Sequence, residues 1–459
     1  MLEIGQHIHI VGIGGAGMSA IARVLKARGF VVHGSDRQEG RLIAALREEG
    51  IPVAVGHAPE NLGDADLVLA SSAIPENNPE IQAAHQQGVP IMRRPEFLSL
   101  LTAGYDVIAV AGAHGKTTVA GMIATILLTA DLDPTYIVGG MVSNLSTNAR
   151  VGKGPLFVIE ADEYCNTFLA LTPKIAVVTN IEYDHPDVFP SMRFLRLAFG
   201  EFIERIREDG TLIVCSNDAV ASVIAGSFHA KGGKLVLYGN EPGRELPWHA
   251  GAIRTNEAGG IDFEVLCHGT LLGTVRLQIP GTHNVLNALA ALAVADELGI
   301  AFETACAGLA EFSGTARRFE KLGEAGGVIV IDDYAHHPTQ IKVVLEMAHQ
   351  RYPGHRLIAV WQPHTFSRVK ALREEFLTAF EGADRVLVLP VYAAREVEDS
   401  TINAPDLAAS LVHPAASAAV SLQDAADRLV EMVEVDDVVI LMGAGDEYVV
   451  GEHLLTRLG

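Results

Sequence analysis

The sequence predicts an α/β protein in which parallel sheets are covered by helices and divided among three domains. Its 459 residues suffice for about three domains of roughly 150 residues, each with its own core. Strand-like runs alternate with helix-like runs along most of the chain, which is typical of this class. The apolar mass is mainly Ala, Val, Ile and Leu, the usual filling of parallel sheets, because only 16 Phe, 9 Tyr and 2 Trp are present.

Composition excludes several classes of protein. With 49% hydrophobic and 20% charged residues, the chain is not disordered as a whole. Its formal net charge of −22 and the lack of a basic stripe argue against a nucleic-acid partner. An acidic surface repels anions, so any phosphate site must supply its own local donors.

The chain gives no signal for export or for a membrane. Its uninterrupted apolar runs are too short to span a bilayer, and Met1–Gln6 has no basic region of the kind that begins a signal peptide. The four cysteines show no CxxC spacing, so we expect neither disulfides nor a zinc cage. We therefore expect a cytoplasmic protein without membrane contacts.

Three units follow one another, and we expect domains at 1–103, 104–313 and 314–459. Helical patterns separate the strands that we expect, and a helix is expected at 18–28. The expected strands are His7–Val11, 31–34 and Leu67–Ala70 in the first unit; 107–110, Leu156–Glu160 and 175–179 in the second; and 328–331, Leu357–Trp361, 386–389 and Val438–Met442 in the third. The Gly-rich stretch 232–278 alternates in polarity and predicts antiparallel ribbons.

A glycine turn follows the first strand. Residues 12–17 read GIGGAG, which matches GxGxxG between a strand and a helix, and Asp36 ends the next strand. Such glycines let backbone N–H groups and a helix N-terminus approach a diphosphate. A tight turn without ligand is the alternative, and nothing nearby indicates a nicotinamide or hydride transfer.

A second turn, GAHGKTT at 112–118, follows the strand 107–110 and should open a helix. Small residues there let the backbone surround phosphates, a lysine reaches the β- and γ-phosphates, and a threonine hydroxyl binds Mg²⁺. A full P-loop has glycine where Val110 stands, so the match is to a shortened form. A glycine turn that merely ends in Lys-Thr-Thr is the alternative.

Acidic and polar residues follow the next two strands of this unit. Glu160, Asp162 and Glu163 end one strand, and residues 179–185, TNIEYDH, end the other. Carboxylates at the carboxyl ends of parallel strands are typical metal ligands beside a nucleotide. Either cluster alone would more often be a solvated loop, but together with the second turn they predict one metal–phosphate site.

The third unit repeats this arrangement. Residues 332–338, DDYAHHP, end one strand, and QPHTFSR at 362–368 ends the next. The planar guanidinium of Arg368 could grip a carboxylate through two oxygens. A purely structural role for Arg368 is an equally weighted alternative.

Taken in order, these motifs resemble those of the Mur ligase family, the ATP-dependent amide-forming enzymes of peptidoglycan synthesis and cell-wall biogenesis. The resemblance covers essentially the whole chain, from Gly12 to the turn 443–446. It rests on GIGGAGMS, GAHGKTT, EADE, TNIEYDH, GTHNVLNALAA, ARRFE, DDYAHHPT and QPHTFSR. It implies a Rossmann-like first domain, a central P-loop ATPase-type domain and a Rossmann-like last domain.

The resemblance also implies a role for each matching residue. UDP-sugar binding falls to Gly14, Gly15, Ala16, Asp36, Ser71 and Ser72. ATP binding falls to Gly112, His114, Gly115, Lys116, Thr117, Thr118, His283, Asn284, Asn287, Arg318 and Asp333. The implied magnesium ligands are Thr117, Glu160 and His185, and the implied amino-acid-binding residues are His336, His364 and Arg368. The implied catalytic residues are Lys116, Glu160, His185 and Arg318.

The implied reaction uses ATP and Mg²⁺. ATP phosphorylates the lactyl carboxylate of UDP-N-acetylmuramate, and L-alanine attacks the acyl phosphate, leaving ADP and phosphate. Two alternatives stay open: recycling of the tripeptide L-Ala-γ-D-Glu-meso-diaminopimelate onto the same sugar nucleotide, and a sensor that binds without catalysis. We expect a monomer or weak homodimer whose third domain closes onto the second.

Two positions depart from patterns found in the family. Several members have a carbamylated lysine in the helix after the DH motif, but residues 193–199 contain no lysine, as in the alanine-adding branch. Some alanine-adding relatives have arginine directly after QPH, where this chain has Thr365. We therefore expect Arg368 to carry more of the carboxylate contact.

Overall fold

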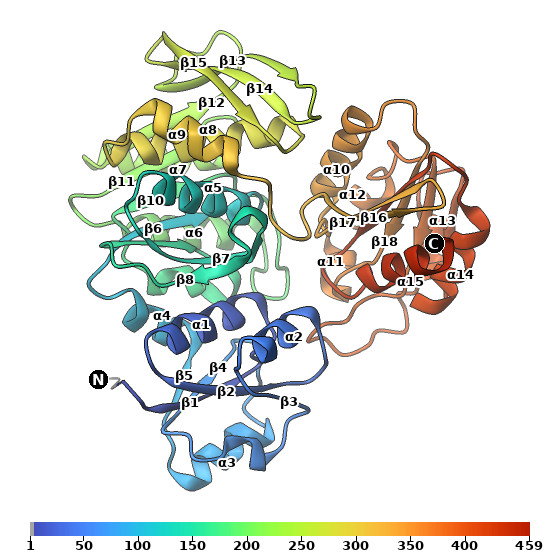
Figure 1. Cartoon of the computed structure of the whole chain (residues 1–459), viewed down its shortest axis with the longest axis horizontal. Coiled ribbons are helices and arrows are strands. Elements are labelled where there is room, and N and C mark those ends of the chain that lie inside the picture. The colour runs from blue at the N-terminus through green and yellow to red at the C-terminus, as the bar shows by residue number, and fades with distance from the viewer. Residues whose placement is uncertain (1–3) are drawn as a thin grey trace.

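The structure, a computed structural model, describes residues 4–459 and contains three sheets that follow one another along the chain (Figure 1). Met1–Glu3, part of the segment inspected for a signal peptide, lie outside the described residues. No helix within residues 4–459 is long and apolar enough to cross a membrane. The chain thus has the three-domain α/β fold that its sequence predicts.

The first domain is a five-stranded parallel sheet in the order β3-β2-β1-β4-β5. Its strands are β1 (His7–Val11), β2 (Val31–Asp36), β3 (Val53–Val55), β4 (Leu67–Ala70) and β5 (Ile91–Arg93). Its helices are α1 (Ala16–Ala27), α2 (Arg41–Glu48), α3 (Pro79–Gln87) and α4 (Arg94–Thr102). The glycine turn lies between β1 and α1, as predicted.

The central domain contains a ten-stranded sheet in the order β15-β14-β13-β12-β11-β10-β6-β9-β7-β8. Its strands are β6 (Asp106–Ala111), β7 (Thr135–Val142), β8 (Thr147–Arg150), β9 (Leu156–Glu160), β10 (Ile175–Val178), β11 (Thr211–Cys215), β12 (Lys234–Gly239), β13 (Trp248–Thr255), β14 (Ile261–Cys267) and β15 (Thr270–Leu277). Its helices are α5 (Lys116–Thr129), α6 (Met192–Ile203), α7 (Ala219–Ala230), α8 (Thr282–Glu297) and α9 (Phe302–Glu311).

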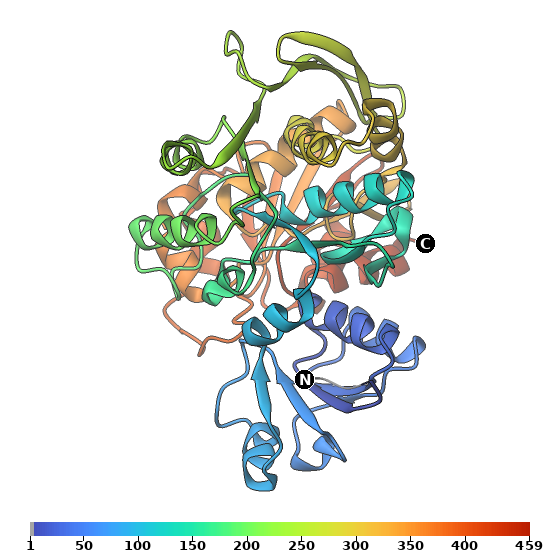
Figure 2. The same ribbon diagram turned by 90° about the vertical axis from the view of Figure 1, so that its left-hand side faces the viewer.

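One prediction for this sheet is wrong. Antiparallel ribbons were expected throughout 232–278, but β12 pairs in parallel with both β11 and β13. Helix α7 carries the chain across the sheet between β11 and β12, which is the connection that a parallel pair needs. Only β13, β14 and β15 form the antiparallel ribbon, at the top of Figures 1 and 2.

The C-terminal domain is a six-stranded sheet in the order β16-β17-β21-β18-β19-β20, parallel except for β16. Its strands are β16 (Glu320–Ala325), β17 (Val328–Asp333), β18 (Leu357–Trp361), β19 (Arg385–Val388), β20 (Ala416–Ala418) and β21 (Val438–Met442). Its helices are α10 (Pro338–Arg351), α11 (Phe366–Ala371), α12 (Arg373–Leu377), α13 (Ala404–Ser410), α14 (Leu422–Met432) and α15 (Tyr448–Leu458).

The first and central domains share one apolar core. Side chains of the first sheet and of α1 belong to the same buried cluster as those on one face of the central sheet. Helix α1 packs on β7 and β8, and buried Arg23 donates to Asn148 across this boundary at 2.7 Å. The C-terminal domain lies beside both, on the right of Figure 1, and has separate clusters on its two sheet faces.

A buried carboxylate holds the first domain together beside its glycine turn. Glu80 on α3 is fully buried and accepts hydrogen bonds from Ser35 at 2.5 Å and from Asn61 at 2.6 Å. His9 and His57 approach the same carboxylate at 3.3 and 3.2 Å. Burial alone would raise the pKa of Glu80, but these polar partners lower it to about 2.

We therefore expect acid to weaken the fold through Glu80. A carboxylate whose pKa falls from 4.5 to about 2 on folding adds stability above pH 4.5, and this is lost as the pH falls through about 2. The effect is about 3 kcal/mol. Urea unfolding of wild type and Glu80→Gln between pH 7 and 3 measures it. A pH slope equally steep in both proteins contradicts the assignment.

Candidate active site

The turn between β6 and α5 has the conformation of a phosphate-binding loop. Gly112 and Gly115 have φ of 137° and 86°, values that side chains disfavour. A Cβ at Gly115 would lie 2.6 Å from Oδ1 of Asn287 on α8. The loop thus needs glycine both for its backbone shape and for the close approach of α8.

Residues at the end of β10 hold this loop in place. The carbonyl of His114 accepts hydrogen bonds from the Thr179 hydroxyl at 2.6 Å and from the Asn180 amide at 3.0 Å. The Asn180 side-chain oxygen in turn accepts from the backbone N–H of His114 at 2.9 Å. The sequence predicts that the polar residues at 179–185 converge with this turn on a metal–phosphate site, and in the structure Thr179 and Asn180 support the loop itself.

Lys116 begins α5 and is held by an acidic partner. Its Nζ donates to Oε2 of Glu163 at 2.7 Å and to the carbonyl of Gly112 at 2.5 Å. Burial would lower the pKa of Lys116, but the carboxylates of Glu163, Asp162 and Glu160 raise it instead. The sequence placed Glu163 in the acidic cluster but did not identify it as the partner of the lysine.

The structure brings Thr117 and Glu160 together beneath the loop. The Glu160 carboxylate accepts from the backbone N–H of Gly139, and Thr117 lies close enough to lower the pKa of this carboxyl. Burial raises the pKa of Glu160, although the Gly139 N–H and the charges of Lys116 and Arg318 lower it in part. A buried carboxylate of this kind is suited to a cation.

His185 lies on the other side of Glu163. Its Nε2 is 3.9 Å from Oε1 of Glu163 and 3.8 Å from Oδ2 of Asp184, and its Nδ1 is buried without a hydrogen-bond partner. Its φ of 55° is unusual for a residue with a side chain. Thr117 and Glu160 offer oxygen atoms, the ligands that Mg²⁺ prefers, whereas His185 offers a nitrogen and contacts Glu163 and Asp184.

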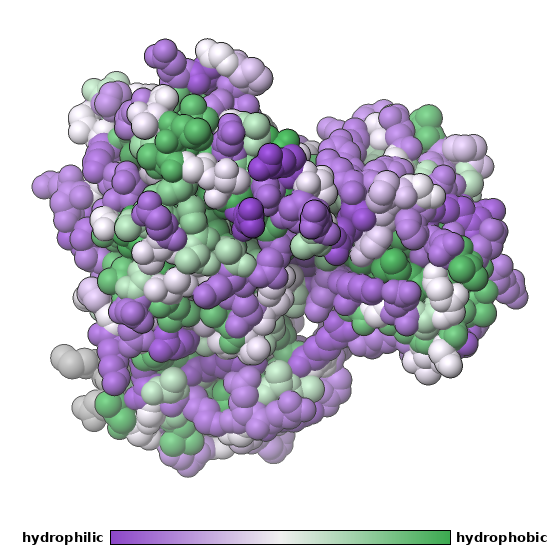
Figure 3. Space-filling model, turned by 45° about the horizontal axis from the view of Figure 1, so that its top comes forward, coloured by the Kyte–Doolittle hydropathy of each residue, from purple (hydrophilic) through white to green (hydrophobic). Residues whose placement is uncertain are grey.

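A cavity of about 680 Å³ opens beside the loop, between the central and C-terminal domains. Figure 3 shows that hydrophilic residues line the hollow between these parts of the molecule. The residues expected at ATP that line the cavity are His114, Gly115, Thr117, Thr118, His283, Asn284, Asn287, Arg318 and Asp333. Its volume lies within the range typical of small-molecule sites.

Two titratable groups in this cavity have shifted pKa values. Burial, with the positive charge of Arg318, lowers the pKa of His283 to about 4, so this histidine is neutral at pH 7. Burial raises the pKa of Asp333 to about 6, although its carboxylate accepts from the N–H groups of Phe319 and Ala335 at 2.7 and 2.8 Å. Such shifts mark a site screened from water.

The residues expected at the amino acid form a second group beside the cavity. Buried Arg368 donates through Nε to Oδ1 of Asp184 at 2.7 Å, which joins the C-terminal to the central domain. Its Nη1 contacts Nδ1 of His364 at 2.7 Å. Burial and the charge of Arg368 lower the pKa of His336 to about 3 and that of His364 well below its usual value.

Thr365, between His364 and the helix that contains Arg368, has an unusual backbone conformation. Its φ is 63°, a conformation that β-branched residues rarely adopt, and its side chain is buried. Its N–H donates to the carbonyl of Tyr392 at 3.0 Å. The position where some relatives have arginine therefore contributes a fixed turn and no positive charge.

In the first domain, Asp36 supports the glycine turn. Its Oδ2 accepts from the backbone N–H of Gly14 at 2.9 Å. Gly15 is the N-cap of α1, which begins at Ala16. The end of β4 faces this turn: a Cβ at Gly12 would lie 3.1 Å from that of Ser71, and Oγ of Ser72 is buried without a partner.

Comparison with protein families covers all three domains. Residues 7–106 match the model of the Mur ligase family, catalytic domain; residues 110–295 match the Mur ligase middle domain; and residues 317–445 match the Mur ligase, glutamate ligase domain. The chain belongs to the Mur ligase family.

Individual Mur ligases resemble the chain over its whole length. The UDP-N-acetylmuramate–L-alanine ligase of Frankia casuarinae is 42% identical over 99% of this chain and 98% of its own. That of Salinibacter ruber is 41% identical over 99% and 95%. The crystal structure of the UDP-N-acetylmuramate-alanine ligase of Thermotoga maritima, 30% identical, superposes with a TM-score of 0.82 over 98% of both chains.

A Mur ligase with another name has the same fold. The murein peptide ligase of Psychrobacter arcticus is 26% identical, with a TM-score of 0.77 over 99% of both chains. The fold alone therefore does not distinguish the chain from that protein.

Proposed function

We propose that this Mur ligase joins L-alanine to the lactyl carboxylate of UDP-N-acetylmuramate, with conversion of ATP to ADP and phosphate. The observation that carries the proposal is Lys116, held as a cation by Glu163 on a glycine loop that lines a cavity between two domains. That arrangement is suited to phosphoryl transfer. Relatives named for the alanine reaction match the chain from end to end.

In this proposal the central domain supplies the phosphoryl donor site. The loop N–H groups and Lys116 hold the ATP phosphates, and Arg318 approaches the same cavity from the C-terminal domain. Two cations around the transferring group stabilise the negative charge that spreads over its oxygens. The resulting acyl phosphate is a far better acyl donor than the original carboxylate.

Thr117, Glu160 and His185 would hold Mg²⁺. The proximity of Thr117 to the Glu160 carboxylate and the unpartnered Nδ1 of His185 fit this assignment. When bound, Mg²⁺ neutralises phosphate charge and orients the phosphate oxygens. The protein's contribution is to fix the ligands and keep the surrounding site dry.

The C-terminal domain would hold the acceptor. Arg368, kept in place by Asp184, would bind the alanine carboxylate. Neutral His336 donates through Nδ1 to the Tyr334 carbonyl, so its Nε2 would accept a hydrogen bond from the amine. His364 would keep Arg368 in place, because its Nδ1 accepts from Nη1 of Arg368. Such contacts aim the amine at the acyl carbon. The UDP portion would lie at the turn between β1 and α1, on the N–H groups around Gly14 and Gly15.

These roles correspond to domains at 1–103, 104–313 and 314–459, for UDP-sugar, ATP and amino acid respectively. Because ATP and a UDP-sugar are its substrates, we place the reaction in the cytoplasm.

The test is phosphate release from ATP in the presence of Mg²⁺ and UDP-N-acetylmuramate. L-Alanine or the tripeptide L-Ala-γ-D-Glu-meso-diaminopimelate is added in parallel reactions, and the amide product is followed by mass spectrometry. We expect release and product with L-alanine. Product only with the tripeptide would assign the chain to the recycling reaction, and no product with either acceptor in protein that binds ATP would indicate a sensor.

A further inference from the structure

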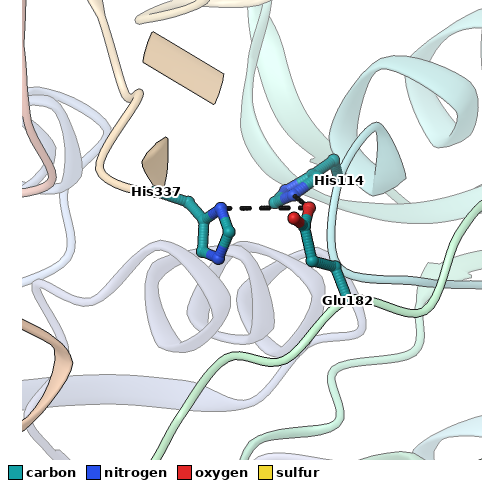
Figure 4. Close-up of side chains that lie close together, drawn as sticks. All are labelled: His114, Glu182 and His337. Carbon is teal, nitrogen blue, oxygen red and sulfur yellow. Dashed lines mark hydrogen bonds and ion pairs between the residues drawn. The ribbon is translucent and has the colours of Figure 1, made fainter. Parts of the chain in front are cut away.

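Three ligand-type side chains meet at the interface between the central and C-terminal domains (Figure 4). His114 Nε2 lies 2.7 Å from Oε2 of Glu182, and His337 Nδ1 lies 3.8 Å from the same oxygen. His114 belongs to the phosphate loop, whereas His337 caps helix α10 of the other domain. The spacing of these three side chains would suit a metal ion, but their ring nitrogens and carboxylate oxygens are already used in hydrogen bonds within the protein.

The amide of Gln340 fixes which ring nitrogen of His114 carries the proton. Gln340 Oε1 accepts from the backbone N–H groups of His336 and His337 at 3.0 and 3.1 Å. Its Nε2 therefore donates to Nδ1 of His114, 2.9 Å away. The proton of neutral His114 must then be on Nε2, where it is donated to Glu182.

This proton arrangement leaves no lone pair at His114 Nε2 for a metal. Glu182 accepts a further bond through Oε1 from the Thr339 hydroxyl at 2.6 Å, and these partners lower its pKa to about 2 although it is partly buried. His337 has its own partners, because its Nε2 donates to the Tyr183 carbonyl at 3.3 Å and its Nδ1 accepts from the Thr339 N–H. The cluster is a satisfied hydrogen-bond network.

The network forms a ring that starts and ends on the first turn of α10. It runs from Gln340 to His114, on to Glu182, and back to Thr339. His114 stands two residues before Lys116, and Gln340 is bonded to the N–H of His336. The ring thus connects the phosphoryl-donor side of the site to the acceptor side.

We propose that Gln340 and Glu182 are positioning residues that latch the C-terminal domain to the phosphate loop, so that the acyl phosphate meets the amine before water does. This inference rests on the proposed function for its chemistry. An acyl phosphate is exposed to hydrolysis whenever the domains separate, and alignment of donor and acceptor depends on their closure. The latch favours the closed arrangement without touching the reacting atoms.

Gln340→Met tests the latch, because methionine keeps the shape of the side chain and loses its hydrogen bonds. One of these bonds, to His114, crosses the interface, whereas the bonds from the N–H groups of His336 and His337 lie within the C-terminal domain. Loss of one net hydrogen bond corresponds to roughly a fivefold weakening of closure. We expect the KM for L-alanine to rise by that factor, and phosphate released per amide formed to rise from one to about two or more. Thr339→Val also loses one bond across the interface, from the Thr339 hydroxyl to Glu182, and should show a change of similar size in the same direction.

Two controls separate the latch from general damage to the fold. Gln340→Glu keeps the acceptor that caps α10 and can pair with a protonated His114, so it should restore the wild-type phosphate-to-amide ratio. Lys342→Met changes an exposed residue on another face of α10, beside Leu345 and His349, and should leave both quantities unchanged. A folded Gln340→Met protein with an unchanged ratio and KM overturns the proposal.

A measurement without turnover distinguishes failure of the latch from failure of the proposed reaction. Fluorophores on the central and C-terminal domains report the distance between these domains by energy transfer. The measurement uses ADP alone, so it does not depend on which amino acid or peptide the enzyme accepts. We expect Gln340→Met to lower the energy transfer and Gln340→Glu to preserve it. Equal energy transfer in all variants overturns the latch. Stoichiometric Zn²⁺ binding that His337→Ala abolishes would also overturn it, because the cluster would then be a metal site.

Discussion

Lys116→Met should reduce ADP formation by roughly 10²- to 10⁴-fold, the range typical for removal of a positioned charge in phosphoryl or acyl transfer. Lys116 is partly buried, and its ammonium group is oriented by Glu163 and by the carbonyl of Gly112. No other lysine among residues 4–459 has contacts with the phosphate loop in the structure. Methionine fills the same space but leaves the carboxylate of Glu163 without its cation.

The measurement is ADP release under saturating substrates, with ATP binding followed separately by calorimetry. Lys174→Met is the matched control, because Lys174 also pairs with a carboxylate of the central domain, Asp106 at 2.7 Å, away from the loop. That variant should keep wild-type turnover. Near-normal ADP formation by Lys116→Met would remove the basis of the proposed phosphate site.

Arg368→Ala should have the second largest effect, on both alanine binding and stability. The substitution leaves buried Asp184 without its cation, and loss of one partner of a buried ion pair costs about 3–5 kcal/mol. It also removes the proposed partner of the alanine carboxylate. We expect the KM for L-alanine to rise at least tenfold and the unfolding midpoint to fall.

Arg368→Lys and Arg356→Ala separate these two effects. Lysine keeps the charge beside Asp184 but lacks the planar fork, so it should recover much of the stability and little of the alanine affinity. Arg356 pairs with buried Asp437 at 2.7 Å inside the C-terminal domain, and its loss should lower stability alone. An unchanged KM for L-alanine in Arg368→Ala would contradict the role of this residue in binding.

Sequence predicted the parts of this molecule that depend on nearby residues. The turn at 112–115, the helix that Lys116 begins and the strand Leu156–Glu160 all follow from local pattern, because glycines, apolar runs and polar strand ends act over short distances. Helix α1 begins two residues earlier than expected, at Ala16, since small residues of the turn continue into it.

Contacts between distant segments could not be predicted in this way. Nothing in the local sequence says that Glu163 holds Lys116, or that Gln340 meets His114 from a helix more than two hundred positions later. The parallel pairing of β12 escaped prediction for the same reason, since alternating polarity does not reveal strand direction. These features depend on how finished elements pack against one another.

The first two domains share one continuous apolar core, so the boundary between them differs in kind from the boundary with the C-terminal domain. A cut between those domains would expose hydrocarbon surface on both sides, so we regard them as one cooperative unfolding unit. The last domain is attached through charged and hydrogen-bonded pairs such as Arg368–Asp184 and Arg41–Glu452. It is therefore the module that evolution, or a protein engineer, could exchange with the least disturbance to the nucleotide-binding part.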